Sequence, residues 1–327
     1  MIDELSALRL IEERFHKASK GVELGIGDDA AAVVFDADKL VLATTDSQVE
    51  DIHFVKSLIS PAELARKVVA VSVSDVGAMG GVPRFILASI GFSEREDEEF
   101  LEELISGFVS SLKEFKVELI GGNLSSSNKL FLDITVLGEV EPDLMVRRSG
   151  ATAGDLIFVS GSLGDSALGL KILQDEEIGD GNEFLMNRHL RPSPRLALGR
   201  ELAQKQLATS MIDISDGLII DLERITVHKE LGARIELLQI PISKEYSECI
   251  RQFSDDKYEL AISGGEDYEL LFTSPEERQR DIQEISKNLN IKITEIGYVT
   301  EDSTIQFINK NGEETSLKQR GFVHFNN

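Results

Sequence analysis

Apolar residues along the chain follow two periods, one typical of strands and the other of helices. Short apolar runs predict strands at 40–45, 85–92, 117–120, 130–140, 156–160, 234–240, 259–262, 268–273 and 291–299. Helical spacing predicts helices at 1–20, 60–79, 101–115, 164–173, 194–204 and 217–227, and the polar segment 174–187 is predicted to be a mobile loop. Because strands and helices interleave in both halves, we expect an α/β (or α+β) fold with domains at 1–145 and 146–327.

The helix predicted at 60–79 carries the most informative acidic residue. Its start combines a capping serine, Ser60, with Pro61 and the capping-box glutamate Glu63. Asp75 continues the apolar stripe of this helix, four residues after Val71. A carboxylate on a core-facing stripe is costly unless it is paired, hydrogen-bonded or metal-bound. We favour metal binding over a buried hydrogen-bonded aspartate, because similar acidic segments accompany it.

Aspartates among glycine, serine and threonine recur at 25–29, 44–46, 72–75 and 212–216. Aspartates that converge repel one another unless cations lie between them. Thr44, Thr45 and Asp46 offer the hard oxygen ligands that Mg²⁺ prefers, although threonine is also common in strands. Asp28 and Asp29 follow two glycines, so an inward-facing turn and an ordinary turn are both compatible. The pattern favours an enzyme that handles phosphates with several metal ions.

The segment around Asp213 predicts the start of the helix at 217–227. Asp213 lies between two isoleucines, and Ser215 or Asp216 is expected to cap the helix. A helix start offers backbone N–H groups to a phosphate. An ordinary acidic cap is the alternative for Asp216.

Three further polar positions are candidate ligand contacts, each with a structural alternative. Glu266 follows a glycine pair that is typical of a hairpin turn, and it can instead contact a substrate. His53 is either a surface residue or a substrate contact. Arg148, next to Arg147, suits a nucleotide phosphate, although a solvated basic pair is also compatible.

Composition narrows the class of protein. The 327 residues carry a formal charge of −24, which disfavours nucleic acid and anionic membrane surfaces as partners. Divalent cations would reverse the local sign for a phosphate substrate. The single cysteine, Cys249, excludes an intramolecular disulfide. With no signal pattern and no apolar run of transmembrane length, a cytoplasmic protein without membrane contact is expected. P-loop, protein-kinase and dinucleotide-binding motifs are also absent from the sequence.

Taken together, these segments resemble the thiamine-monophosphate kinases, a family within the aminoimidazole ribonucleotide synthetase superfamily. The matching segments are GIGDDAAAV (25–33), TTDSQVEDIHF (44–54), VSVSDVGAMGGVP (71–83), VSGSLGDSALGL (159–170), RPSPRLALG (191–199), MIDISDGLIIDL (211–222), SGGEDYELLFT (263–273) and GFVHF (321–325). The resemblance spans nearly the whole chain. It implies two α/β domains, with strands of the N-terminal domain forming a homodimer interface.

The resemblance implies transfer of the γ-phosphoryl group of ATP to thiamine monophosphate, giving thiamine diphosphate, with several Mg²⁺ ions. Implied metal ligands are Asp29, Thr44, Thr45, Asp46, Asp75, Asp213 and Asp216. Implied ATP contacts are Gly122, Arg148 and Ser215, and implied thiamine monophosphate contacts are His53, Glu266 and Phe322. No general base is assigned, because the acceptor phosphate is largely ionised near neutral pH. Direct in-line transfer is expected.

Asn123 departs from the family pattern. The family usually has Gly-Gly-Asp-Thr-Thr where this chain has Gly-Gly-Asn-Leu-Ser at 121–125. The Asn123 carbonyl can still bind a metal ion or ATP, with one negative charge fewer. Two alternatives stay open. One is another ATP-using enzyme of the superfamily, which the internal position of Cys249 disfavours, and the other is a non-catalytic relative that binds nucleotide or thiamine phosphate.

Overall fold

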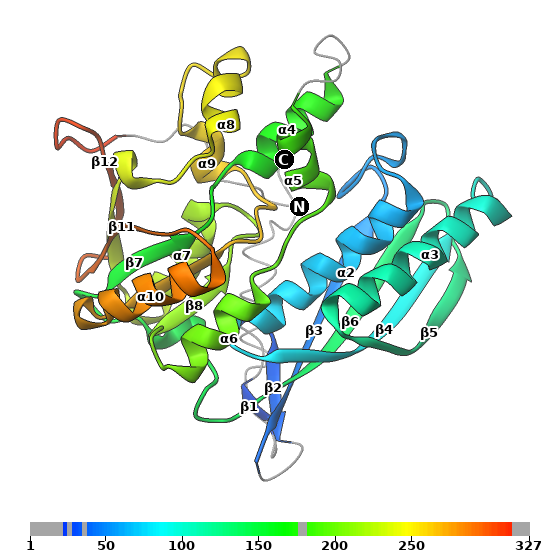
Figure 1. Cartoon of the computed structure of the whole chain (residues 1–327), viewed down its shortest axis with the longest axis horizontal. Coiled ribbons are helices and arrows are strands. Elements are labelled where there is room, and N and C mark those ends of the chain that lie inside the picture. The colour runs from blue at the N-terminus through cyan, green and yellow to red at the C-terminus, as the bar shows by residue number, and fades with distance from the viewer. Residues whose placement is uncertain (1–21, 25–27, 35–37, 176–181, 316–327) are drawn as a thin grey trace.

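Two six-stranded sheets, each with its own helices, lie side by side in the computed structural model (Figure 1). The structure describes residues 22–24, 28–34, 38–175 and 182–315. The predicted α/β fold with two domains is confirmed. The expected division at 145/146 falls between the last strand of the first sheet and the first strand of the second. The helix predicted at 1–20 lies outside the described residues.

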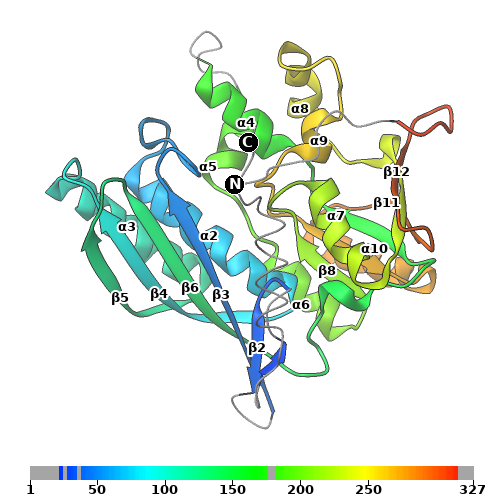
Figure 2. The ribbon, with the colours of Figure 1, turned by 180° about the vertical axis from the view of Figure 1, so that it is seen from behind.

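The first sheet has the strand order β1-β2-β3-β6-β4-β5. Its strands are β1 (Val22–Leu24), β2 (Ala31–Val34), β3 (Leu40–Val49), β4 (Val82–Phe92), β5 (Glu118–Ser126) and β6 (Phe131–Val140). Helices α2 (Pro61–Ala78) and α3 (Glu98–Phe115) cover one face. Figure 2 shows the opposite face, over which no described helix lies. Alternate residues of β6 are buried beneath the helices, as strand geometry requires.

Two strand ends in this sheet differ from prediction. β3 continues past Asp46 to Val49, so Asp46 lies inside the strand rather than at its end. β5 continues through Gly121 and Gly122 to Ser126, beyond the predicted end of the strand at 120. The glycines serve close packing, because a Cβ on Gly122 would lie 1.9 Å from the Ala88 carbonyl oxygen. A register irregularity between β4 and β5 accompanies them.

The second sheet has the order β12-β9-β11-β7-β10-β8. Its strands are β7 (Leu156–Ser160), β8 (Ser210–Asp213), β9 (Gly232–Glu236), β10 (Leu270–Ser274), β11 (Ile293–Thr300) and β12 (Ile305–Ile308). Its helices are α4 (Asp165–Gln174), α5 (Glu183–Leu190), α6 (Leu196–Gln204), α7 (Leu218–Thr226), α8 (Lys244–Cys249), α9 (Glu259–Ser263) and α10 (Gln279–Leu289). Short 3-10 helices lie at Lys56–Leu58, Arg148–Gly150, Val227–Lys229, Leu237–Gln239, Ile250–Gln252 and Glu276–Arg278.

Alternation along β7 divides the second domain into two cores. Ile157 and Val159 join residues of α4 and α7 on one face. Phe158 faces the other way and stacks on Phe272, with 5.3 Å between ring centroids, in a core that includes α6 and α10. Helices therefore pack on both faces of this sheet.

Three predictions in the second half were wrong in detail. The segment 259–262, predicted as a strand, forms helix α9, because a short apolar run does not distinguish the two structures. The polar segment 174–187 contains the start of α5, capped by the Asn182 side chain. The strand predicted at 234–240 ends at Glu236 and gives way to a 3-10 turn. Strand β8 and helix α10 were not predicted.

Helix α2 packs against both domains. The predicted capping box is present, since the Ser60 hydroxyl accepts from the Glu63 N–H at 3.2 Å and the Glu63 carboxylate accepts from the Ser60 N–H at 3.4 Å. Thirteen of its eighteen residues are buried. A Cβ on Gly199 of α6 would lie 2.0 Å from the Gly77 carbonyl oxygen, so the two helix backbones are in direct contact.

Among the described residues, no helix combines the length and apolar character needed to cross a lipid bilayer.

Candidate active site

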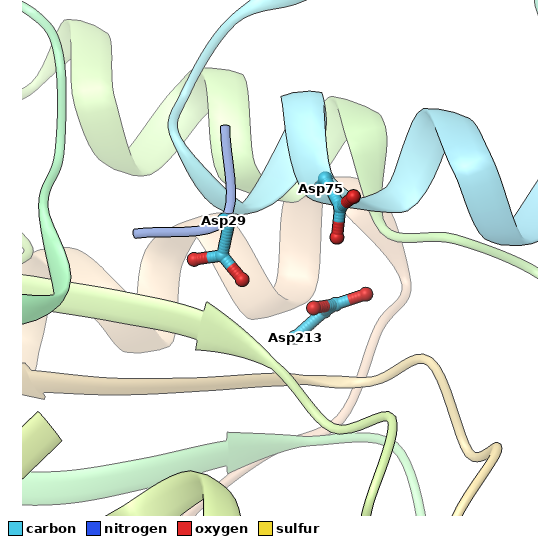
Figure 3. A group of neighbouring side chains, drawn as sticks. All are labelled: Asp29, Asp75 and Asp213. Carbon is cyan, nitrogen blue, oxygen red and sulfur yellow. The ribbon is translucent and has the colours of Figure 1, made fainter. Parts of the chain in front are cut away.

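Three aspartates from distant parts of the chain converge between the two domains (Figure 3). Asp29 precedes β2, Asp75 lies on α2 and Asp213 ends β8. One carboxylate oxygen of each lies within 4.8 Å of the other two. Asp29 and Asp213 are buried, and Asp75 is half-buried. The structure thus brings together, as an aspartate trio, residues from three of the predicted acidic segments.

The electrostatics of the aspartate trio favour a bound cation. Burial raises the pKa of Asp75 well above its ordinary value, and the charges of Asp46 and Asp213 raise it further. Burial raises the pKa of Asp213 in the same way, followed by the charge of Asp29. The Oδ2 atoms of Asp29 and Asp213 are buried without a hydrogen-bond partner. A divalent cation would neutralise this charge and satisfy both atoms, and carboxylate oxygens suit Mg²⁺.

Strand β3 adds two of the predicted ligands to this region. Thr44 Oγ1 donates a hydrogen bond to Asp75 Oδ2 at 2.6 Å. Asp46 lies two residues further along, on the same face of the strand. Burial raises the pKa of Asp46 to about 6, and the charges of Asp216 and Asp29 contribute. Asp46 and Asp216 therefore extend the acidic region beyond the trio.

The start of α7 differs from the predicted cap. The N-cap residue is Gly217, with φ of 111°, and neither Ser215 nor Asp216 caps the helix. The backbone N–H groups of Ser215 and Asp216 instead donate to Asp221 Oδ2, each at 3.1 Å. These two N–H groups are satisfied within the chain, and binding of a phosphate at the helix start stays a prediction.

Arg224 on α7 supports Asp216. Its guanidinium contacts Asp216 at 2.6 Å and Asp221 at 2.7 Å. Burial raises the pKa of Asp221 to about 7, although Arg224 acts in the opposite direction. Sequence reasoning missed both residues. Asp221 and Arg224 are three residues apart, so they are neighbours on the surface of one helix, and they follow the predicted acidic segment 212–216. This spacing was the available signal.

Arg148 lies in the segment that joins the domains. Its guanidinium donates to Asp29 Oδ1, and its backbone N–H donates to Asp28 Oδ2 at 3.2 Å. Burial alone would lower the pKa of this guanidinium, but Asp29 and Asp28 raise it above its ordinary value. Arg148 therefore stays charged, fixes the Asp29 carboxylate and offsets one charge of the trio. Its predicted role as an ATP contact stays a prediction.

A cavity of about 680 Å³ lies between β3 and the second domain. Six predicted ligands line it: Thr45, Asp46, His53, Ser215, Asp216 and Glu266. Apolar side chains, including Ile52, Leu170 and Leu260, form another part of its wall. Residues predicted to bind metal and residues predicted to contact the substrate therefore line the same cavity, which has room for an organic phosphate.

Glu266 is presented to this cavity by a strained loop. The backbone φ is 65° at Glu266 and 50° at Tyr268, values that are costly for residues other than glycine. The Glu266 N–H donates to the Ser215 carbonyl at 2.7 Å, and the Tyr268 N–H donates to the Ile214 carbonyl at 2.9 Å. The loop joins α9 to β10, so the alternative of a hairpin turn between two strands does not apply.

A buried ion network anchors the same loop. The fully buried Glu269 carboxylate accepts from Arg188 at 2.9 Å, Arg195 at 2.5 Å and the Ser160 hydroxyl at 2.6 Å. Burial alone would raise the pKa of Glu269, but the two arginines lower it below its ordinary value. Arg188 also donates to the Asp267 carbonyl at 3.3 Å. Sequence reasoning missed this network, although a glutamate directly before the apolar run of β10 was a signal.

Some predicted ligands lie apart from the trio. Thr45 faces the other side of β3, and its hydroxyl lies 3.2 Å from that of Thr135. Gly122 and Asn123 lie on β5, the exposed edge strand of the first sheet. Phe322 is outside the described residues. The roles of these four predicted ligands stay predictions.

Comparison with known proteins places this geometry in a family. The chain matches the models for the N-terminal domain (residues 27–140) and the C-terminal domain (residues 152–309) of AIR synthase related protein. It is 37% identical over 325 residues to thiamine-monophosphate kinase of Escherichia coli strain K12, with 98% of both chains covered. The Haemophilus influenzae thiamine-monophosphate kinase is 39% identical over 311 residues, with 93% of this chain and 92% of the relative covered. The solved structure of AaThiL complexed with AMPPCP and TMP has a TM-score of 0.85 at 34% identity, covering 99% of this chain and 97% of that one.

The paired domains and the acidic site between them define a member of the AIR synthase related proteins. Within that group, similarity over nearly the full length shows that the chain belongs to the thiamine-monophosphate kinase family, which confirms the resemblance found in the sequence. It is therefore an enzyme of the thiamine-phosphate kinase class.

Without Mg²⁺, the Asp213→Asn variant is expected to be more stable than the parent protein, and it is expected to gain less stability when Mg²⁺ is added. In the metal-free protein, loss of one of three repelling carboxylates should raise the Tm by about 2–4 °C. With Mg²⁺ the variant should gain less than the parent protein, because it has lost a charged ligand. Thermal unfolding in EDTA and in saturating MgCl₂ measures both effects, with the exposed Asp281→Asn as the control. Equal Mg²⁺-induced shifts in Asp213→Asn and the parent protein would contradict the site.

Asp267 predicts a pH dependence of folding. Burial raises the pKa of this carboxyl from 3.8 to about 8 in the folded chain. Between these values the folded state binds more protons than the unfolded state, so the free energy of unfolding falls as pH rises. The Asp267→Asn variant keeps an oxygen that can accept from the Gly164 N–H, now 2.7 Å from Asp267. Chemical denaturation at about pH 5 and about pH 8 should show a smaller loss in the variant. A loss equal to that of the parent protein would refute this assignment.

Proposed function

We propose that the chain transfers the γ-phosphoryl group of ATP directly to the phosphate of thiamine monophosphate, in a reaction that requires Mg²⁺. The observation that carries the proposal is the position of the aspartate trio next to a cavity that holds His53 and Glu266. The relative solved with AMPPCP, an unreactive analogue of ATP, and TMP supports both substrates.

The acidic residues fit a role in holding Mg²⁺. Asp29, Asp75 and Asp213 supply three converging carboxylates, two of them with an unsatisfied oxygen. When bound, the metal would neutralise phosphate oxygens and polarise the γ-phosphate. Asp46 and Asp216 line the cavity, where they can bind further ions. The Thr44 and Arg148 contacts described above hold their carboxylate partners in fixed orientations.

The remaining residues position the acceptor. His53 and Glu266 offer polar contacts to thiamine monophosphate, and the apolar part of the wall can pack against its rings. A phosphate monoester is already ionised enough to attack, so the chain does not have to supply a general base. Positioning and charge neutralisation then account for the catalysis.

The open face of the first sheet supports a homodimer. Large apolar side chains on β4 are exposed there: Phe85 at 42% and Leu87 at 38%. An apolar surface of this kind marks a protein contact, and strands of two copies can meet through the same face. This arrangement is the predicted dimer interface.

The proposed role of Asn123 depends on that dimer. Asn123 is aligned across the sheet with Ser89, Asp133 and Ser47 in turn. Ser47 lies three strands away, about 14 Å at ordinary strand spacing. One chain therefore leaves Asn123 and its neighbour Gly122 far from the trio. A second copy on the open face, or an extended nucleotide, would have to close this distance.

The direct test is an assay with Mg-ATP and thiamine monophosphate. The parent protein should form thiamine diphosphate, and Asp75→Asn should lower kcat/KM about hundredfold or more, because charge stabilisation in the transition state is lost. The exposed Asp281→Asn is the matched control. Absence of product with the parent protein would refute the proposal. Binding of both substrates without turnover, restored by Asn123→Asp, would instead identify a non-catalytic relative.

In-line transfer makes a separate prediction about stereochemistry. A single displacement at phosphorus inverts the configuration of a chiral γ-phosphate, whereas a phosphorylated protein intermediate gives two inversions and net retention. Use of an isotopically chiral ATP and analysis of the thiamine diphosphate formed distinguishes these outcomes. Inversion is expected, and retention would rule out direct transfer.

A further inference from the structure

A buried lysine contacts Glu266 from the other domain. Lys67 lies on α2 and its side chain is 0% exposed, an unusual position for an ammonium group. Its Nζ lies 3.2 Å from Glu266 Oε1 and donates to Glu266 Oε2 at 3.3 Å. The Glu266 side chain itself is 26% exposed and lines the cavity. Lys67 therefore holds a carboxylate whose exposed part lines the cavity.

His189 on α5 completes this arrangement. Its Nε2 lies 3.2 Å from Lys67 Nζ, and its Nδ1 lies 3.2 Å from both Glu266 Oε2 and the Ser166 hydroxyl. Burial lowers the pKa of His189 to about 4, and the charge of Lys67 contributes. The imidazole is thus neutral near neutral pH. Since Lys67 can only donate, Nε2 accepts and Nδ1 carries the proton toward Glu266 or Ser166.

The charges of this cluster determine what it can recognise. Lys67 is positive, Glu266 is negative and His189 is neutral, so the net charge is close to zero. Burial alone would raise the pKa of Glu266, but Lys67 lowers it below its ordinary value. An ionised carboxylate already paired with an ammonium group favours an N–H donor more than a free cation. An aromatic amine is such a donor.

Helix α2 also fixes the separation between Lys67 and Asp75. Lys67 precedes Asp75 by eight residues on this helix, and both side chains contact the second domain. Eight residues of α-helix span about 12 Å. An acceptor that spans this length would place its phosphate at the acidic region and an N–H donor at Glu266. A phosphate monoester of a single small ring would be too short to make both contacts.

We propose that Lys67, together with His189, is a positioning residue that fixes Glu266 to accept a hydrogen bond from an amine at the end of the acceptor remote from its phosphate. This contact selects two-ring amine phosphates over shorter phosphate monoesters. The proposal rests on the proposed function, because it concerns the acceptor of the same reaction. The structure supports it through three side chains, from α2, α5 and the loop before β10, that meet at one wall of the cavity.

The test compares Lys67→Met with the parent protein on two acceptors, thiamine monophosphate and the phosphate monoester of the thiazole alcohol alone. The variant should raise the KM for thiamine monophosphate by about tenfold to a hundredfold, the range for one lost hydrogen bond to a charged group. Affinity for AMPPCP should change by less than about twofold, because that ligand does not depend on the contact. The kcat/KM for thiamine monophosphate, divided by the kcat/KM for the thiazole phosphate, should be lower in the variant than in the parent protein.

Two controls separate positioning from folding. Lys205→Met removes an exposed lysine that pairs with Glu201, and it should change neither KM nor the acceptor ratio. The double variant Lys67→Met/Glu266→Gln leaves no unpaired buried carboxylate, so it should recover thermal stability while the KM stays raised. Recovery of the parental KM and acceptor ratio in the double variant would show that Lys67 acts only in stability and would overturn the proposal.

Two further outcomes are decisive. An unchanged KM and acceptor ratio in a folded Lys67→Met variant would also overturn the proposal, while leaving the kinase function intact. If the parent protein forms no thiamine diphosphate, the proposed function fails first, and this inference fails with it.

Discussion

Mutual repulsion among buried carboxylates is the constraint on which this structure depends. Asp29, Asp75 and Asp213 come from a loop, a helix and a strand, and their oxygens are forced within 4.8 Å of one another. Such a cluster costs free energy unless positive charge compensates it. Arg148 compensates one carboxylate from within the chain. We propose that divalent cations, which a phosphate-transfer enzyme needs in the same place, compensate the remaining charge.

Helix α2 makes this arrangement possible because it belongs to both domains. One side packs on the first sheet, and another contacts α6 so closely that Gly77 and Gly199 have no room for side chains. Rigid packing of this kind lets one helix hold Asp75 against the second domain near its C-terminal end and Lys67 eight residues earlier. The proposed metal site and the proposed acceptor contact therefore both depend on this helix.

Sequence patterns predicted the local features of the site but not its three-dimensional partners. The capping box and apolar stripe of α2 were sufficient to place Asp75 on the inward side of the helix, because both depend on short-range spacing. The fold of α9 and the true cap of α7 were missed, since tertiary packing decided them. Lys67 and His189 were not predicted as site residues, because their partner, Glu266, is far away in sequence. Thr45 was placed with Thr44, although strand alternation sends the two hydroxyls to opposite faces.

Diffraction from crystals soaked with Mn²⁺ and AMPPCP tests the central claim most directly. Manganese binds the same oxygen ligands as magnesium and can be located by its anomalous scattering. We expect anomalous peaks among the carboxylates of Asp29, Asp75 and Asp213, at about 2.0–2.3 Å from the ligating oxygens. Peaks confined to the protein surface, with the three carboxylates protonated or satisfied by other side chains, would contradict the account.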